Sequence, residues 1–187
     1  ASIAYGIDVK PEEILIEGIE NINSEDIFFA KEFGYNIKLL TIAKKCGNQV
    51  ELRVHPALVP IKQMIAKVDG VMNGISVIGD RVGETMYYGP GAGGSATASA
   101  VVSDLIDIAR HTQNSPMLGF IKPLESAGLS LMNSDDIATK YYMRVKVADK
   151  IGVLSKISEV LGRHSISISS FLQKQDALKE NSAVLLF

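Results

Sequence analysis

A cluster of glycines limits what this chain can fold into more than any other feature: four of the seven residues in Gly89-Pro90-Gly91-Ala92-Gly93-Gly94-Ser95 are glycine. A strand-like run precedes the cluster and a helix-like run from Ala96 to Thr112 follows it, which predicts a tight strand-to-helix turn. Glycine lets backbone N–H groups approach a ligand without a clash from a Cβ atom, and the following helix directs its positive end at the same place. The segment is either a site for an anion or a cofactor edge, or a turn whose glycines serve only the backbone.

The spacing of these glycines differs from the two common nucleotide-binding fingerprints. The cluster lies late in the chain, no acidic residue ends a following strand about 20 residues further on, and no Gly-Lys-Ser/Thr sequence is present. We therefore do not expect a complete dinucleotide site within this sequence.

Length, charge and cysteine content limit the number of domains and the kinds of partner that this chain can have. With 187 residues and roughly 150 residues per domain, the chain forms one or two domains. The formal net charge is −2 and no cluster of Lys and Arg is visible, so nucleic acid is an unexpected partner. No apolar run approaches the roughly 18 to 20 residues of a membrane span, and we expect no membrane insertion. The single Cys46 cannot close an intrachain disulfide, which indicates a reducing, cytoplasmic setting.

The first part of the chain predicts helices and paired strands. Ser24 is a candidate cap for a helix that ends at Gly34. A hairpin over 37–55 turns at Gly47-Asn48, places Glu51, Arg53 and His55 on a solvated face, and is broken by the stretch 56–60. A second strand pair is expected at 74–78 and 82–88.

Weak periodicity and two prolines indicate a linker over 116–139, which divides the chain into domains 1–115 and 140–187. In the second domain we expect a strand over 141–147, a helix capped by Asp149 and ended by Gly162, a strand beginning at 166 and a further strand over 183–187. The predicted fold class is α+β, within the wider α/β group: a mixed β-sheet with helices on one face, followed by a partial ferredoxin-like βαββ domain.

The residues around the glycine cluster resemble the glycine-rich signature of the homoserine dehydrogenase family. The matching segments, in the order that the family shows across the later half of its catalytic domain, are Glu17-Gly18-Ile19, 29–35, His55-Pro56, 69–73, 87–94 and 97–105. This resemblance spans most of the chain.

The resemblance implies an NAD(P)-dependent oxidation of L-homoserine to L-aspartate 4-semialdehyde, on the route to threonine and methionine. In that family the glycine loop lies against the cofactor, which makes Gly91, Gly93 and Thr97 the cofactor-contact candidates. The family's Rossmann domain and its catalytic acid/base residues have no counterpart in this sequence, and Ala1 to Gly6 resemble the continuation just beyond the catalytic lysine. We therefore expect a C-terminal fragment that contains no catalytic residue and is inactive alone, with NADP or NAD held mainly by the absent domain.

The segment 147–154 resembles the first strand-to-helix turn of an ACT domain, a ferredoxin-like module that often binds amino acids. The resemblance implies Asp149, Gly152 and Val153 as effector-binding candidates, with an amino acid such as threonine as the effector. Ile151 replaces the usual proline, so the unit either binds an effector or only builds a dimer. The alternative function for the whole chain is an amino-acid-responsive dimerisation or regulatory module without catalysis, and both alternatives imply a homo-oligomer.

Other reactive side chains have plainer interpretations. His55 is expected to pack or to form hydrogen bonds rather than to catalyse, and Cys46 to behave as a small apolar residue. Asp104 and Asp107 lie three residues apart on a predicted helix without a third oxygen ligand, which favours a solvated face. Tyr87 and Tyr88 are expected to point to opposite sides, one of them buried. No metal site is predicted.

Overall fold

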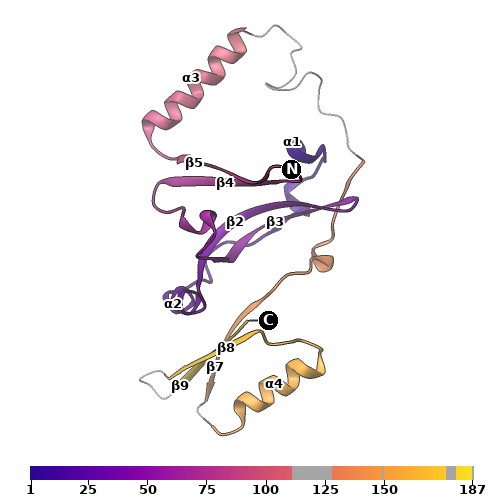
Figure 1. Ribbon diagram of the computed structural model, residues 1–187, viewed down its shortest axis with the longest axis vertical. Helices are drawn as coiled ribbons and strands as arrows, with labels where there is room; N and C mark the ends of the chain where they lie inside the picture. The colour runs from indigo at the N-terminus through magenta and orange to yellow at the C-terminus, as the bar shows by residue number, and fades with distance from the viewer. Residues whose placement is uncertain (111–127, 149, 176–179, 187) are drawn as a thin grey trace.

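The computed structural model describes residues 1–110, 128–148, 150–175 and 180–186, and Figure 1 shows how their helices and strands are arranged. The part before the glycine cluster contains α1 (Ser2–Tyr5), η1 (Pro11–Glu13), β1 (Leu15–Ile16), α2 (Ser24–Glu32), β2 (Tyr35–Cys46), β3 (Gln49–Pro60), η2 (Met64–Lys67), β4 (Met72–Gly79) and β5 (Gly83–Pro90). After it come α3 (Gly94–Arg110), β6 (Ser130–Leu131), η3 (Ser134–Asp136), β7 (Tyr142–Ala148), α4 (Val153–Arg163), β8 (Ser170–Gln175) and β9 (Glu180–Leu186).

The first sheet is mixed, which confirms the predicted fold class. Its centre is the antiparallel hairpin β2–β3, which turns at Gly47 (φ 61°) and Asn48 as expected. Two short strands, β1 and β6, add parallel pairings along β3. Pairing partners of β3 thus come from both the beginning and the later part of the chain.

The hairpin is longer than the sequence predicts, because Pro56 does not break β3. Pro56 lies opposite Leu39 inside a continuous strand that ends only at Pro60. A strand accepts proline where its missing N–H does not face a neighbouring strand. The parallel pairing with β1 is described at Arg53 and Val54, before the proline, so the interruption that we expected at 56–60 is wrong.

The face of β3 that carries Glu51, Arg53 and His55 is not the solvated face that the alternation predicts. Glu51 is only 3% exposed. Its Oε1 lies 2.8 Å from Arg53 Nε, and the side chain of Arg53 is 14% exposed. Alternation shows that these residues share a face, but it does not show whether another segment covers that face. Here the charges are buried as a pair, as burial requires.

The apolar face of β3 forms the core. Val50, Leu52 and Ile7 are buried there, and half-buried apolar side chains pack against them: Tyr5, Val9, Ile14, Leu129 and Leu131. Leu129 and Leu131 lie within the expected linker 116–139, so residues beyond the glycine cluster contribute to this core.

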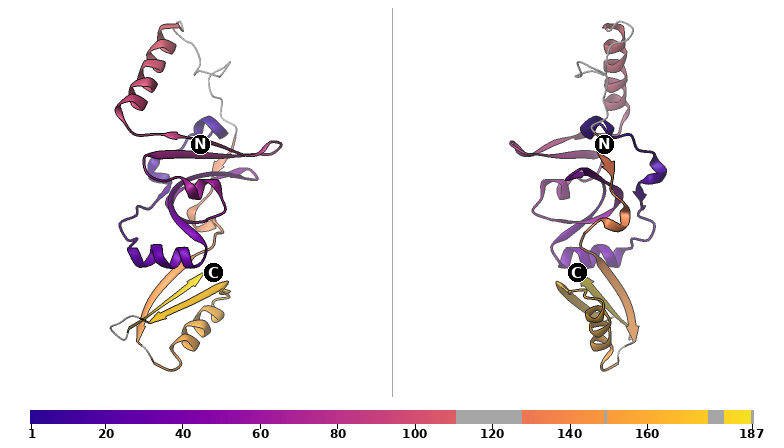
Figure 2. Two further views of the ribbon diagram at one scale, coloured as in Figure 1. Left: turned by 60° about the vertical axis from the view of Figure 1, so that its left-hand side comes forward. Right: turned by 90° about the vertical axis from the view of Figure 1, so that its right-hand side faces the viewer.

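The second hairpin, β4–β5, matches the predicted strand pair and leads directly into α3. No described residue of α3 is buried, and Figures 1 and 2 show the helix extending away from the sheets. The helix expected from Ala96 begins at Gly94 and is described as far as Arg110. Of the expected linker over 116–139, residues up to 127 lie outside the described part, and the remainder contains β6 and η3.

The helix α2 ends as expected but begins differently. Asn23, not Ser24, is its N-cap: Asn23 Oδ1 accepts a hydrogen bond from Asp26 N, and Asp26 Oδ2 accepts one from Asn23 N, both at 3.1 Å. This reciprocal arrangement is a capping box. Gly34 follows the helix with φ 80°, the left-handed conformation expected at its end.

The C-terminal elements form a separate three-stranded antiparallel sheet with the order β7-β9-β8. Gly152 takes the N-cap position of α4 that we expected of Asp149, a residue outside the described part. The helix runs through Gly162 to Arg163, and β8 begins at Ser170 rather than near residue 166. The predicted strand–helix–strand order is confirmed, with boundaries shifted by a few residues.

Candidate functional site

Backbone hydrogen bonds hold the chain in place where the β4–β5 hairpin leads into the glycine cluster. Gly89 lies opposite Asn73 and Pro90 lies opposite Met72, so the ladder continues into the cluster. The N–H of Gly91 then donates a hydrogen bond to Val71 O at 3.2 Å. The strand therefore holds the turn in place as far as Gly91, and the chain is free to change direction only after it.

Gly93 is the position where the backbone itself requires glycine. Its φ is 118°, a conformation that residues with a Cβ rarely adopt, and the space around its missing side chain is open to 4 Å. Its carbonyl oxygen accepts a hydrogen bond from Thr97 N at 3.0 Å, which closes the first turn of α3. The result is bare backbone beside a helix N-terminus.

Gly91 needs to be small for a different reason. A Cβ atom at this position would overlap the side-chain amide of Asn73, which lies against the Gly91 backbone. In the sequence, Asn73 is only the last residue of the segment 69–73 that resembles the family, and nothing in its surroundings there indicates a role. The register of the hairpin places Asn73 opposite Gly89, two residues before Gly91. This pairing is the signal that could have indicated the contact.

Around the turn, the structure leaves polar groups accessible. The first N–H groups of a helix have no partner within it, and no acidic residue occupies the first turn of α3 to neutralise them. Thr97 is exposed one turn into the helix. Tyr87 and Tyr88 are 68% and 57% exposed, so the expectation that one of them is buried is wrong. This surface is suited to an anionic or hydrogen-bonding group that approaches from solvent.

The residues predicted for an effector are placed at the start of α4. Gly152 has φ 87° and open space around its missing side chain, and Val153 begins the helix directly after it. Asp149 lies outside the described residues. The turn is thus a second place where exposed backbone precedes a helix, more than fifty residues after the glycine cluster.

The remaining candidates are placed away from the glycine cluster. His55 Nδ1 lies 2.8 Å from Pro56 O, and its Nε2 is buried without a hydrogen-bond partner among the described residues. Cys46 is a free, half-buried thiol at the end of β2. Asp104 and Asp107 lie on α3, and the described ranges contain no group of three His, Cys, Asp or Glu side chains that could hold a metal ion.

Within the ranges that the structure covers, none of the helices combines the length and the apolar character needed to span a bilayer.

Comparison with known proteins identifies relatives over the whole chain. A family profile described as homoserine dehydrogenase matches residues 1–106. A homoserine dehydrogenase of Helicobacter pylori is 57% identical over 187 residues, which is 100% of this chain and 43% of that protein. One from Neisseria gonorrhoeae is 42% identical over 93% of this chain and 41% of its own length. The chain therefore spans less than half the length of these curated relatives.

Solved structures agree with this assignment. The crystal structure of a homoserine dehydrogenase from Thiobacillus denitrificans has a TM-score of 0.84 and 42% identity, over 99% of this chain and 43% of its own. A homoserine dehydrogenase from Staphylococcus aureus has a TM-score of 0.65 and 29% identity, over 98% of this chain and 44% of its own. The family profile covers more than half of the sequence, and these likenesses extend to its C-terminal sheet. The chain belongs to the homoserine dehydrogenase family.

Proposed function

We propose that this chain serves the NAD(P)-dependent oxidation of L-homoserine to L-aspartate 4-semialdehyde, a step toward threonine and methionine, as the later part of the enzyme. The observation that carries the proposal is the open, left-handed Gly93 at the junction of β5 and α3, inside the segment that the family profile matches. An activity for the chain as an amino-acid-responsive module without catalysis has no comparable support.

A nicotinamide held at this surface would supply the acceptor for the hydride that leaves the alcohol carbon of homoserine. The chain's own part is to admit and orient that ring and its ribose. Gly93 presents open backbone at close range, Gly91 is proposed as a further contact beside it, and Thr97 adds an exposed hydroxyl one helical turn further on. Removal of solvent and precise placement of the reacting groups are the contributions that such a surface makes to a hydride transfer.

No lysine described here is assigned the proton transfer that accompanies this reaction. The Nζ of Lys38 donates hydrogen bonds to Val68 O and, at 2.6 Å, to Asp69 Oδ1, so two of its three protons are already engaged. A catalytic base must lie within hydrogen-bond reach of the substrate hydroxyl. We propose that the base, like most of the NADP or NAD site, belongs to the part of the enzyme that precedes this chain.

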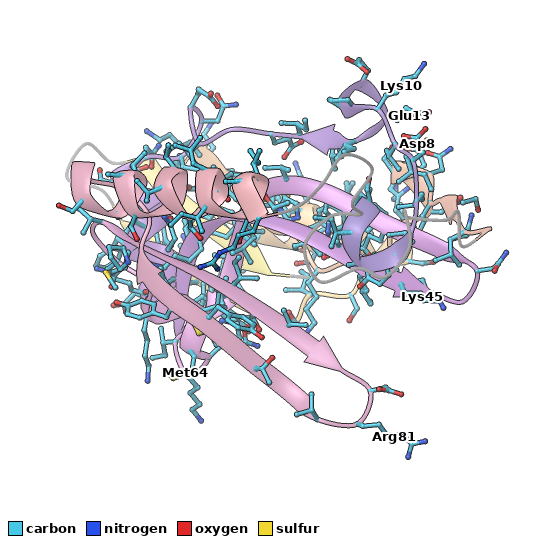
Figure 3. The ribbon with its side chains drawn as sticks, turned by 90° about the horizontal axis from the view of Figure 1, so that it is seen from above. Asp8, Lys10, Glu13, Lys45, Met64 and Arg81 are labelled. Carbon is cyan, nitrogen blue, oxygen red and sulfur yellow. The ribbon has the colours of Figure 1, made fainter. Side chains whose placement is uncertain are left out.

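The proposal is tested by Gly93→Val in the full-length enzyme, with Gly83→Val as a matched control. Both glycines have a positive φ and open space around them, so a side chain strains the backbone at either position. Gly83 begins β5, whereas Gly93 lies beyond the other end of this strand, after Pro90. Figure 3 shows Arg81, which is close in sequence to Gly83, at the free tip of the hairpin. We expect Gly93→Val alone to raise the KM and the Kd for the coenzyme.

Equal coenzyme affinities for the two variants would contradict the proposal, because backbone strain without ligand contact affects both. Homoserine-dependent formation of NAD(P)H by the isolated chain would contradict the assignment of the base to another part of the enzyme. Binding of the coenzyme measured by titration calorimetry distinguishes loss of contact from loss of catalysis.

We propose in addition that the C-terminal unit is a partial ACT-type domain that binds an amino acid such as threonine at Asp149, Gly152 and Val153. Two observations support this. Helix α4 lies between β7 and β8 in the chain, and the sheet has the order β7-β9-β8, as in the beginning of a ferredoxin-like module. Threonine is expected to raise the melting temperature of the chain, since a ligand that binds only the folded state stabilises it.

The variant Gly152→Ala should remove this shift, because a Cβ enters the open turn at φ 87°. Gly70→Ala is the control: Gly70 has φ 65° and open space but lies before β4. A wild-type chain whose melting temperature does not respond to threonine would instead support a purely dimer-building role. We also propose that the enzyme is cytoplasmic and forms a homo-oligomer.

A further inference from the structure

The first turn of α2 is in direct contact with β7, although the two segments are far apart in sequence. Tyr142 Oη and Arg144 Nε each donate a hydrogen bond of 2.7 Å to Asp26 Oδ1. Arg144 also donates to Asp26 Oδ2 at 3.4 Å and to Glu25 Oε2 at 2.7 Å. Figures 1 and 2 show α2 at the end of the first part of the molecule that faces the C-terminal sheet.

The contact is built from largely buried charges. Asp26 is 4% exposed, and the side chain of Arg144 is 16% exposed. The guanidinium uses three of its nitrogen atoms on two adjacent carboxylates, which its planar fork allows and a lysine ammonium does not. Such a geometry fixes the direction of approach of β7 as well as its distance.

Asp26 also helps to cap the N-terminus of α2. The same carboxylate accepts the hydrogen bond of Asn23 N in the capping box, and Asp26 N donates in return to Asn23 Oδ1. A helix of 9 residues is marginal in isolation and depends on its cap and its packing. One carboxylate therefore accepts hydrogen bonds both from the backbone at the N-terminus of α2 and from two side chains of β7.

The ionisation of the cluster agrees with this arrangement. Burial alone would raise the pKa of Asp26, but hydrogen bonds from Arg144, Tyr142 and the Asn23 backbone outweigh it and hold the pKa below its usual value. The hydrogen bond to Asp26 is the largest cause of the raised pKa of Arg144. The pair is thus ionised in the folded chain near neutral pH.

We propose that the acidic first turn of α2 is an intramolecular docking site for β7, and that docking of the C-terminal unit and formation of the α2 N-terminus are one coupled equilibrium. The partner surface is defined by its chemistry: a guanidinium and a phenol hydroxyl, two residues apart on the same side of an antiparallel strand. The coupling also connects the C-terminal unit to the hairpin β2–β3, because only Phe33 and Gly34 separate α2 from β2.

Hydrogen exchange on the 187-residue chain tests the coupling without any ligand or activity. In Arg144→Met, we expect exchange at the α2 amides of residues 26–29 to rise by about ten-fold or more, together with exchange in β7. Lys146→Met is the matched control, since Lys146 is an exposed cation on the same strand, two residues further on. It should leave both segments unchanged.

Faster exchange in β7 with unchanged α2 amides in Arg144→Met would overturn the proposal, as would equal effects of the two substitutions. If Arg144→Met does not fold, Tyr142→Phe provides the test, because it removes one hydrogen bond to Asp26 and keeps the ion pair. A smaller rise in the same α2 amides is then expected, and no rise would overturn the proposal. Neither outcome depends on how the glycine cluster binds a coenzyme.

Discussion

The side-chain amide of Asn73 fills the space that a Cβ atom at Gly91 would occupy. Gly91→Ala must therefore displace this amide. Because the amide is the end of a side chain that can rotate, we expect a modest loss of about 1 kcal/mol in the free energy of unfolding. Urea unfolding of the chain measures this loss.

A double-mutant cycle shows whether the contact is the cause. In Asn73→Ala/Gly91→Ala the obstructing amide is gone, so the second substitution should cost much less than it does alone. Gly89→Ala is the neighbouring control, since a Cβ atom there meets nothing within 4 Å. Additive losses in the double variant would mean that Asn73 does not determine the need for glycine at position 91.

Lys38 holds the segment that leads into β4. Its side chain is 19% exposed, and its Nζ lies 2.6 Å from Asp69 Oδ1. Lys38→Met removes this ion pair and the hydrogen bond to Val68 O, and we expect a loss of about 1 kcal/mol in urea unfolding. Lys44→Met, at an exposed position on the same strand, is expected to cost less. Equal losses would show that the contact contributes nothing.

The stability of the chain should depend on pH in the acid range through Asp26. Its pKa is lower in the folded chain than the ordinary value of 3.8, so the unfolded chain binds the proton more tightly. The stabilisation is present above pH 3.8 and is lost as the pH falls through the folded pKa. Urea unfolding at a series of pH values measures this slope.

Asp26→Asn removes the titrating group and should flatten the acid dependence, at the cost of lower stability near neutral pH. The groups that face Asp26 are Glu25 and Asn23 on its own side and Tyr142 and Arg144 on β7. Glu25→Gln is the control, because it leaves the Asp26 contacts in place. A dependence as steep in Asp26→Asn as in the wild type would assign the acid transition to other carboxylates.

One face of the β4–β5 hairpin bears on the proposed homo-oligomer. Ile75 lies opposite Tyr87, and the two side chains are 65% and 68% exposed. Burial of such an exposed apolar pair against a second subunit would be favourable. We expect Ile75→Lys to shift sedimentation toward a smaller species, whereas Ile78→Lys, on the opposite face of the same strand, should not. Identical sedimentation of both variants would place the interface elsewhere.

Local sequence patterns predict the local elements well. Gly47-Asn48 marks the turn of the first hairpin, Gly34 marks the end of α2, and the glycine cluster marks the passage from β5 to α3. In each case the residue type itself restricts the backbone conformation, so no knowledge of the rest of the chain is needed.

Long-range contacts explain what the patterns miss. The burial of Glu51 depends on which segment covers its face of β3, and alternation along one strand contains no such information. Pro56 is compatible with β3 because of where a neighbouring strand stops. The partners of Asp26 come from a strand more than a hundred residues later, and no local pattern around Asp26 indicates them.

The short strand β6 has a consequence for where this protein can be divided. It pairs with β3 at Gln49 and Val50, while β1 pairs with β3 at Arg53 and Val54. The chain thus returns, after the glycine cluster and its helix, to complete a sheet that it began near its first residues. A truncation placed before Ser130 would therefore remove β6, expose Val50 and leave the first sheet without one of its strands. The two halves of this chain are consequently not independent modules that can be separated at the midpoint.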